Sequence, residues 1–174
     1  GDTQVLQYHI LQTNAGCHIK AVCQILNTHC GIVKRVCYRH RVSADSVVEK
    51  CIIGEGTQIY GNVSNSVIGC GVTIEEGAVI KDSIIMNHAT VGANCVLTKA
   101  IVSEYAQIGD NVIMGEGEEV DNETHPHIYN QGLICIGDKT VVPSNVKIGK
   151  NIVISGITTA EDYPDNCLAS GKSL

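Results

Sequence analysis

Three histidines in the C-terminal three quarters of the chain are the residues best suited to acid–base chemistry. They are His88, His125 and His127. Because the ordinary pKa of histidine lies near neutral pH, a histidine beside a hydroxyl or an amine can remove its proton and so promote acyl transfer. An acyltransferase with one of these histidines as its general base is therefore one function that the residue types allow. It predicts coenzyme A turnover by the purified chain.

The nine cysteines offer a second kind of chemistry, but their pattern favours free thiols. Their number is odd, and no charged start followed by an apolar stretch and a cleavage site precedes them. Cys51 and Cys95 fall where small inward residues are expected, Cys70 and Cys135 fall outside those positions, and Cys167 lies in the tail. None has a basic neighbour in sequence that would activate it as a nucleophile.

Composition limits the partners and the compartment. The net charge is −6, and no apolar run approaches the roughly 20 residues that cross a bilayer. The chain is therefore expected to be soluble and cytoplasmic, without nucleic acid or membrane as a partner. It has no Phe, no Trp and only 6 Tyr, so its core must be narrow and aliphatic.

Residues 1–42 form a separate, irregular segment. They hold one acid against five bases, together with four cysteines and four histidines, whereas the other 132 residues hold 17 acids and 7 bases. A zinc site is one explanation for the seven ligands Cys17, His18, Cys23, His29, Cys30, Cys37 and His40. Their spacings match none of the usual short zinc knuckles, so no metal site is expected.

A six-residue period begins at about residue 43 and determines the fold that must position these side chains. Aliphatic residues recur six apart at Ile53 and Ile59; Ile68, Ile74 and Ile80; Ile85, Val91 and Leu97; Val102 and Ile108; and Ile136, Val142, Ile148 and Ile154. Three positions after these residues stand Gly56, Asn62, Gly71, Gly77, Asn94, Asn111, Asn145 and Asn151, which tolerate positive φ and suit corners. Four positions after them stand small or β-branched residues, namely Thr57, Val63, Val72, Ala78, Cys95, Ala106, Val112, Thr140, Val146 and Ile152.

Related tetrapeptides at residues 65–68, 82–85 and 99–102 add a 17-residue repeat. Three hexapeptides then make one circuit, and the chain returns above itself. We therefore predict that residues 43–174 form an all-β, left-handed parallel β-helix in the shape of a triangular prism. A β-sandwich is the alternative, but its strands would alternate every two residues. One long acidic loop is expected at about 114–132, and its acids exclude a phosphate-binding role for its glycines.

Several segments resemble one enzyme family. They are residues 59–68 (Ile-Tyr-Gly-Asn-Val-Ser-Asn-Ser-Val-Ile), 77–86 (Gly-Ala-Val-Ile-Lys-Asp-Ser-Ile-Ile-Met), 128–132 (Ile-Tyr-Asn-Gln-Gly), 154–157, 161–164 and 169–171. From about residue 43 to the C-terminus the chain resembles the C-terminal β-helix of bacterial glucose-1-phosphate adenylyltransferase, also called ADP-glucose pyrophosphorylase. The resemblance implies an enzyme of glycogen biosynthesis that makes ADP-glucose and pyrophosphate from ATP and glucose 1-phosphate.

In that family catalysis belongs to a separate nucleotidyltransferase domain, which this sequence lacks. No catalytic residue is therefore assigned here, and Mg²⁺ and ATP are expected only on that missing domain, as its partner. The resemblance further implies a β-helix that assembles subunits, as tetramers in relatives, into a homo- or hetero-oligomer. A free-standing structural hexapeptide module is a third hypothesis, which differs only in what the upstream DNA encodes.

The resemblance also implies regulation by anionic effectors, which need basic side chains. Relatives place bases around the segment that matches residues 125–130, where this chain offers two histidines behind several acids. The nearest candidates for an effector site are His125, His127, Lys139 and Lys147. Their alternative reading is that of solvated loop and corner residues.

Residues 1 to about 42 also raise a hypothesis about the reading frame. Relatives enter the β-helix through a Pro-Pro pair, and none occurs here. The codons for Cys37-Tyr38-Arg39-His40, read from their third bases, can spell Leu-Pro-Pro. On this hypothesis, residues 1 to about 42 are translated in the wrong reading frame. The coding DNA would show whether they are.

Overall fold

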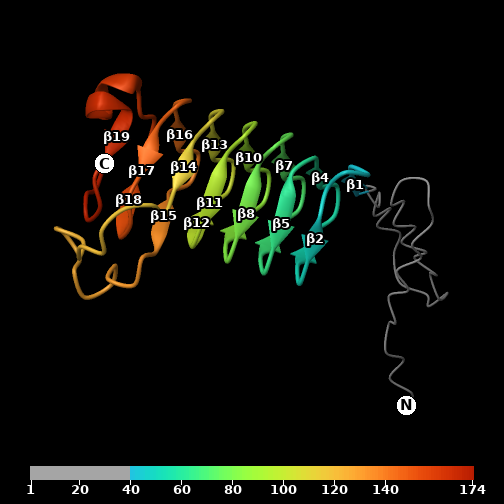
Figure 1. Cartoon of the computed structure of the whole chain (residues 1–174), viewed down its shortest axis with the longest axis horizontal. Helices are drawn as coiled ribbons and strands as arrows, with labels where there is room; N and C mark the ends of the chain where they lie inside the picture. Colours follow the sequence, from blue (N-terminus) through green and yellow to red (C-terminus); the bar gives the residue numbers. More distant parts are fainter. Residues whose placement is uncertain (1–39) are drawn as a thin grey trace, which may run out of the picture.

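The computed structural model describes residues 40–174, whose regular secondary structure is almost entirely short strands that stack in three parallel sheets (Figure 1). Sheet A contains β1 (Arg41–Val42), β4 (Gln58–Ile59), β7 (Thr73–Ile74), β10 (Thr90–Val91), β13 (Gln107–Ile108) and β16 (Val141–Val142). Sheet B contains β2 (Val48–Glu49), β5 (Asn62–Ser64), β8 (Val79–Lys81), β11 (Val96–Thr98), β14 (Ile113–Met114), β17 (Lys147–Ile148) and β19 (Cys167–Leu168). Sheet C contains β3 (Ile52–Ile53), β6 (Val67–Ile68), β9 (Ile84–Ile85), β12 (Ala100–Val102), β15 (Ile134–Ile136) and β18 (Ile152–Ile154).

Successive strands pass through sheets A, B and C in turn, so the chain is a β-helix with three faces, and the predicted all-β fold is confirmed. Paired residues in neighbouring coils are mostly 17 apart, as in the series Val67, Ile84 and Ile101. The interval is 15 between Val48 and Val63 in the first coil. β1 places Arg41 and Val42 in the first coil, two residues before the expected boundary. Of residues 1–42, on which the zinc and reading-frame hypotheses rest, 1–39 lie outside the described part of the chain.

The interior is the one that the six-residue period predicts. All of the predicted inward aliphatic residues are buried except Ile53, which is partly buried in the first complete coil. All ten small residues that follow them by four positions are also buried. Each buried aliphatic side chain contributes on the order of 1.5–3 kcal/mol, so these columns supply most of the stability of the prism.

Corners between the sheets hold the expected positive φ angles at Gly56, Gly71, Gly77, Asn94, Asn111, Asn145 and Asn151. The expectation for Asn62 was wrong, because Asn62 begins β5 and its Oδ1 accepts a hydrogen bond of 2.8 Å from Val47 N. The left-handed conformation also occurs at His88, Tyr105 and Lys139, which stand at the same third position after inward residues. It occurs as well at four corners outside that position, namely Lys50, Asn65, Asp82 and Lys99. Side chains at these corners are exposed, so polar and charged residues occur there although a positive φ is unfavourable for residues other than glycine.

The long loop has the expected length, begins one residue later than expected and is well anchored. Met114 is buried in β14, so the irregular segment covers residues 115–133. The buried Asn122 donates to Asn151 O at 2.9 Å and accepts from His125 N at 2.9 Å. Asn151 in turn accepts from Gly132 N at 2.7 Å and donates to Val120 O at 2.8 Å. Three of these hydrogen bonds fasten the loop to the corner that joins β17 to β18, and the fourth, from His125 N to Asn122, lies within the loop.

The C-terminal end of the prism is closed by the short 3₁₀ turns η1 (Ala160–Asp162) and η2 (Pro164–Asn166). Tyr163, between them, is only 1% exposed, and its hydroxyl lies 2.8 Å from Thr158 Oγ1. A large aromatic side chain therefore fits the otherwise aliphatic interior beside the last of the described coils. In residues 40–174 there is no helix long and apolar enough to cross a bilayer.

Candidate functional site

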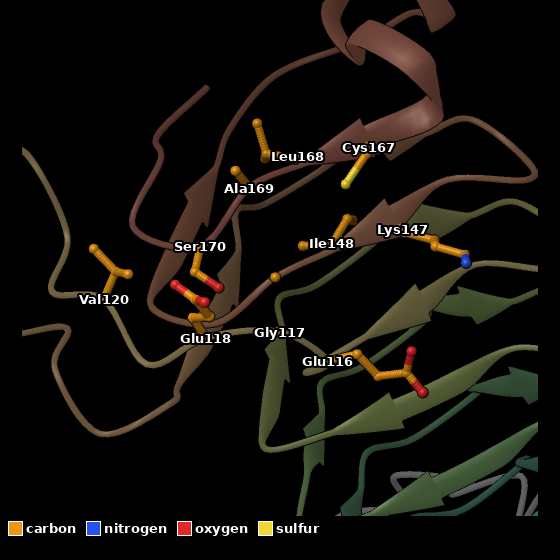
Figure 2. Close-up of a pocket in the computed structure, with 11 residues that line it drawn as sticks. Glu116, Gly117, Glu118, Val120, Lys147, Ile148, Cys167, Leu168, Ala169 and Ser170 are labelled. Atoms are coloured by element: carbon orange, nitrogen blue, oxygen red, sulfur yellow. The ribbon is translucent and has the colours of Figure 1, made fainter.

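A groove of about 480 Å³ lies beside the last coils, between the first residues of the long loop and the strands β17 and β19 (Figure 2). It is lined by Glu116, Gly117, Glu118, Val120, Lys147, Ile148, Gly149, Cys167, Leu168, Ala169 and Ser170. At Gly149 a Cβ atom would come within 2.5 Å of Ser170 N, so glycine is needed for the tail to pack this closely. The groove therefore exists because the tail and the loop close on the same coil.

The charged groups of the groove do not suit a phosphate. Lys147 is its one basic side chain, and Glu116 and Glu118 supply two carboxylates. Figure 2 shows Lys147 and Glu116 on one side of the groove and Glu118 beside Ser170 on the other. Phosphate recognition needs several converging donors that are positively charged. This arrangement instead favours a neutral or weakly basic ligand, or a polypeptide segment.

A second hollow of about 400 Å³ lies at the corner between sheets B and C. Asp82, Lys99, Ile128, Gln131 and Leu133 line it. Lys99 Nζ donates one of its three N–H groups to Gln131 O at 3.4 Å, so the loop contacts the one base of this hollow. Ile128 is 64% exposed at its rim, which leaves an apolar side chain without a partner within the described chain.

The four residues predicted for an effector site lie on three separate parts of the prism. His125 and His127 are exposed on the loop, where the His125 ring meets the Tyr129 ring edge-on at 6.3 Å. Lys139 lies at the corner between sheets C and A, 3.6 Å from the Asp138 carboxylate. Lys147 belongs to sheet B and lines the groove. None of the described hydrogen bonds and ion pairs joins two of them, so the effector site stays a prediction.

His88, the third candidate for acid–base chemistry, lies on the corner between sheets C and A. Its ring stacks on that of Tyr105, with 5.1 Å between the centroids and 18° between the planes. The long loop with His125 and His127 is fastened to a different corner, the one between sheets B and C. Neither of the two hollows described above has a histidine in its lining. Within residues 40–174 no three His, Cys, Asp or Glu side chains converge as a metal site would need.

The structure also shows polar contacts that the sequence pattern did not predict. Burial raises the pKa of the Cys135 thiol, and a hydrogen bond with Tyr129 opposes this shift. Glu123 accepts a hydrogen bond of 2.7 Å from Lys172 Nζ, which lowers the pKa of the Glu123 carboxyl. The first contact joins the loop to β15, which directly follows it, and the second joins it to the C-terminal tail, 49 residues away. The six-residue period predicts neither.

Comparisons with known proteins agree with this architecture. Residues 34–136 match the family model described as GlmU-like, C-terminal hexapeptide. The chain is 54% identical over 130 residues to glucose-1-phosphate adenylyltransferase of Lachnospira eligens, over 75% of this chain and 31% of that protein. It is 44% identical over 135 residues to the enzyme of the same name from Acetivibrio thermocellus, over 78% of this chain and 32% of that protein. The chain thus spans about a third of the length of these relatives.

Among solved structures, the chain is similar to the acetyltransferase domain of PglB from Neisseria gonorrhoeae. The sequence identity is 20%, the TM-score is 0.44, and the match covers 75% of this chain and 54% of that one.

Proposed function

This chain belongs to the GlmU-like C-terminal hexapeptide family, and on that premise we propose that it is the β-helical assembly and regulatory domain of a glucose-1-phosphate adenylyltransferase-like protein. The observation that carries the proposal is the 54% identity to the Lachnospira eligens relative over 130 residues. Identity at this level extends beyond the inward columns that any hexapeptide prism needs. It therefore supports a shared role and not only a shared fold.

The proposed whole protein makes ADP-glucose and pyrophosphate from ATP and glucose 1-phosphate, a step of glycogen biosynthesis. The chemistry is assigned to a nucleotidyltransferase domain outside this chain, which would bind ATP and Mg²⁺. This chain would act in the cytoplasm, would hold subunits together in a homo- or hetero-oligomer, and would not bind nucleic acid or a membrane. Its net charge of −6 supports the last point, because both of those partners are polyanions.

We propose that regulation through this domain uses the exposed histidine and lysine side chains that lie outside the groove. His125, His127 and Lys139 lie on the exposed loop and corner, whereas Lys147 shares the groove with the carboxylates Glu116 and Glu118. An anionic effector would be repelled from the groove and would have to meet the exposed residues in an assembled protein. Substituting each of these residues in that protein would show whether any of them carries regulation.

The test is reconstitution of the reaction. The first two thirds of the Acetivibrio thermocellus relative would be fused to residues 40–174, and pyrophosphate release from ATP and glucose 1-phosphate would be measured with Mg²⁺ present. We expect no turnover by the 174-residue chain alone and turnover by the fusion. A fusion that carries Ile74→Asp is the control, because a charge in the buried column should disrupt the prism.

Two results would contradict the proposal. One is an inactive fusion whose β-helix is shown to be folded by circular dichroism. The other is transfer of an acetyl group from acetyl coenzyme A by the chain alone, since this would assign the acyltransferase chemistry that His88, His125 or His127 could support.

A further inference from the structure

The outward face of sheet C carries an unbroken column of apolar side chains. One residue from each strand contributes, and the six are in register: Ile52, Val67, Ile84, Ile101, Cys135 and Val153. Three of them are large and well exposed, with Ile52 at 72%, Val67 at 42% and Ile84 at 40%. We call these six residues the sheet C column.

The residues next to this column add no charge. Two positions after each member stand Gly54, Gly69, Met86, Ser103, Gly137 and Ser155. Met86 is 39% exposed and apolar, and the others are small. The column and this neighbouring row therefore make a flat, uncharged face that runs the length of the prism. A face of this kind on a protein that acts alone would be unusual, because contiguous apolar patches mark interaction sites.

Strand propensity alone does not explain the sheet C column. Sheet A has strands of the same length, and its outward residues are Arg41, Gln58, Thr73, Thr90, Gln107 and Val141. Polar residues are thus tolerated at the equivalent positions of the same fold. The fold therefore does not require apolar residues at these positions, and a contact outside the chain would explain why sheet C has them at all six.

Charges at the two edges of the face indicate what could cover it. Lys50 and Lys99 lie at the corner where the chain enters sheet C, two residues before Ile52 and Ile101. Glu55 and Glu104 are exposed where the chain leaves it, three residues after the same isoleucines. Asp82, at the entry corner between the two lysines, is held by Asn65 Nδ2 at 2.6 Å. One edge therefore carries bases and the opposite edge carries acids, in the same two coils.

We propose that a second copy of this chain packs on the sheet C column, related to the first by a twofold axis parallel to the prism axis. This operation reverses the strand direction and keeps the height of each coil. Lys50 would then face Glu55 of the second copy, and Lys99 would face Glu104 of the second copy. A twofold axis perpendicular to the prism axis would place each edge against itself and would separate these pairs. The inference rests on the proposed role in assembly and assigns it a surface.

The size of the face fits a small stable interface. Six strands at about 4.8 Å and about five residues at 3.3 Å give a face of roughly 29 by 16 Å, or about 460 Å² in projection. Side-chain relief, together with the exposed Ile128 at the rim, raises this area toward the roughly 600–800 Å² per partner that small stable interfaces bury. An interface of this size lies at the lower end of the range for stable complexes, so we expect a dimer that dissociates when the chain is diluted.

The test is sedimentation equilibrium of the 174-residue chain at concentrations from about 1 to 100 µM. We expect a monomer–dimer equilibrium that Ile84→Lys weakens by at least about tenfold, because a charge would be buried in the interface. Ile52→Lys, at the most exposed position of the column, is a second variant that should leave the fold intact. Thr90→Lys on sheet A is the matched control and should change nothing. A monomer at every concentration, or a dimer that both sheet C variants leave unchanged, overturns the proposal.

A charge exchange tests the direction of the axis. Lys50→Glu and Glu55→Lys should each weaken the dimer several-fold, and the double variant should restore it. Within one chain the two side chains are about 16 Å apart across the sheet, beyond the roughly 8–10 Å over which salt leaves charges coupled, so rescue would have to be intermolecular. Failure of the rescue overturns the parallel axis. If the fusion is active but the 174-residue chain is a monomer, this inference is wrong and the proposed function still stands.

Discussion

Sheets A and C differ on their outward sides although their inward sides are equivalent. Inward positions on both sheets are buried aliphatic residues, such as Ile74 in β7 and Ile85 in β9. Outward positions are polar on most of sheet A and apolar on all of sheet C, as Thr90 and Ile84 illustrate. Close packing in the narrow prism dictates the inner residues, whereas only contacts outside the prism can dictate the outer ones. The outward residues are therefore the ones whose types reflect contacts with other molecules.

The largest expected effect tests the equivalence of the inward sides. Ile74→Ala and Ile85→Ala should each lower the free energy of unfolding by about 2–5 kcal/mol, because each removes buried atoms and leaves a cavity that two neighbouring coils cannot fill. Urea unfolding of the two variants measures this cost. A loss below about 1 kcal/mol at one site and not at the other would show that the two inner faces are not equivalent.

A smaller effect is expected at the corner that borders sheet C. Asn122→Ala removes the amide that holds the loop to Asn151, so the free energy of unfolding should fall by about 1–3 kcal/mol and protease cleavage within residues 120–132 should accelerate. Asn145→Gly is the control, because it keeps a positive φ and removes only an exposed hydrogen bond from Asn111 at 2.9 Å. Equal loop cleavage in the two variants would argue against the anchoring role of Asn122.

Apolar outward residues on sheet A would test whether such a column is sufficient for pairing between chains. The triple variant Thr73→Val, Thr90→Ile and Gln107→Ile should fold normally, with a stability change within about 0.5 kcal/mol for each exposed position. It should form larger assemblies than the native chain, because it would carry two apolar faces. Light scattering measures the mass. An unchanged mass would show that an apolar column is not sufficient for pairing and that the edge charges of sheet C are also needed.

The smallest expected effect concerns two thiols near sheet C. Burial raises the pKa of Cys135, whereas Cys70 lies exposed at the corner between sheets C and A. A raised pKa lowers the thiolate fraction at neutral pH, so alkylation of Cys70 should be about tenfold faster than that of Cys135 at pH 7, and the difference should narrow as the pH rises through the pKa of Cys135. Mass spectrometry of the labelled peptides, with Cys70→Ser as the control, gives both rates. Similar rates at pH 7 would mean that Cys135 is more accessible than its half-buried position indicates.

Much of the candidate site was beyond prediction from the sequence. The hexapeptide period placed Cys95 and Ile148 inside the prism, but it contained no information about which loop residues would close over the strand that carries Ile148. Nothing in the sequence marked Asn122 as buried, because an asparagine in an acidic loop is usually solvated. Tyr163 was equally hidden, since its burial depends on where the last coil ends.

The sequence by itself determined the three-sided β-helix, its circuit and the identity of its inward columns. It could do so because each inward residue needs only the residues one coil away, and a fixed spacing along the chain guarantees that contact. Only the tertiary structure decided which outward residues share a face, where the loop between β14 and β15 lies, and how the tail closes the groove. These features depend on contacts between segments at no fixed spacing, so no local pattern of residue types could specify them.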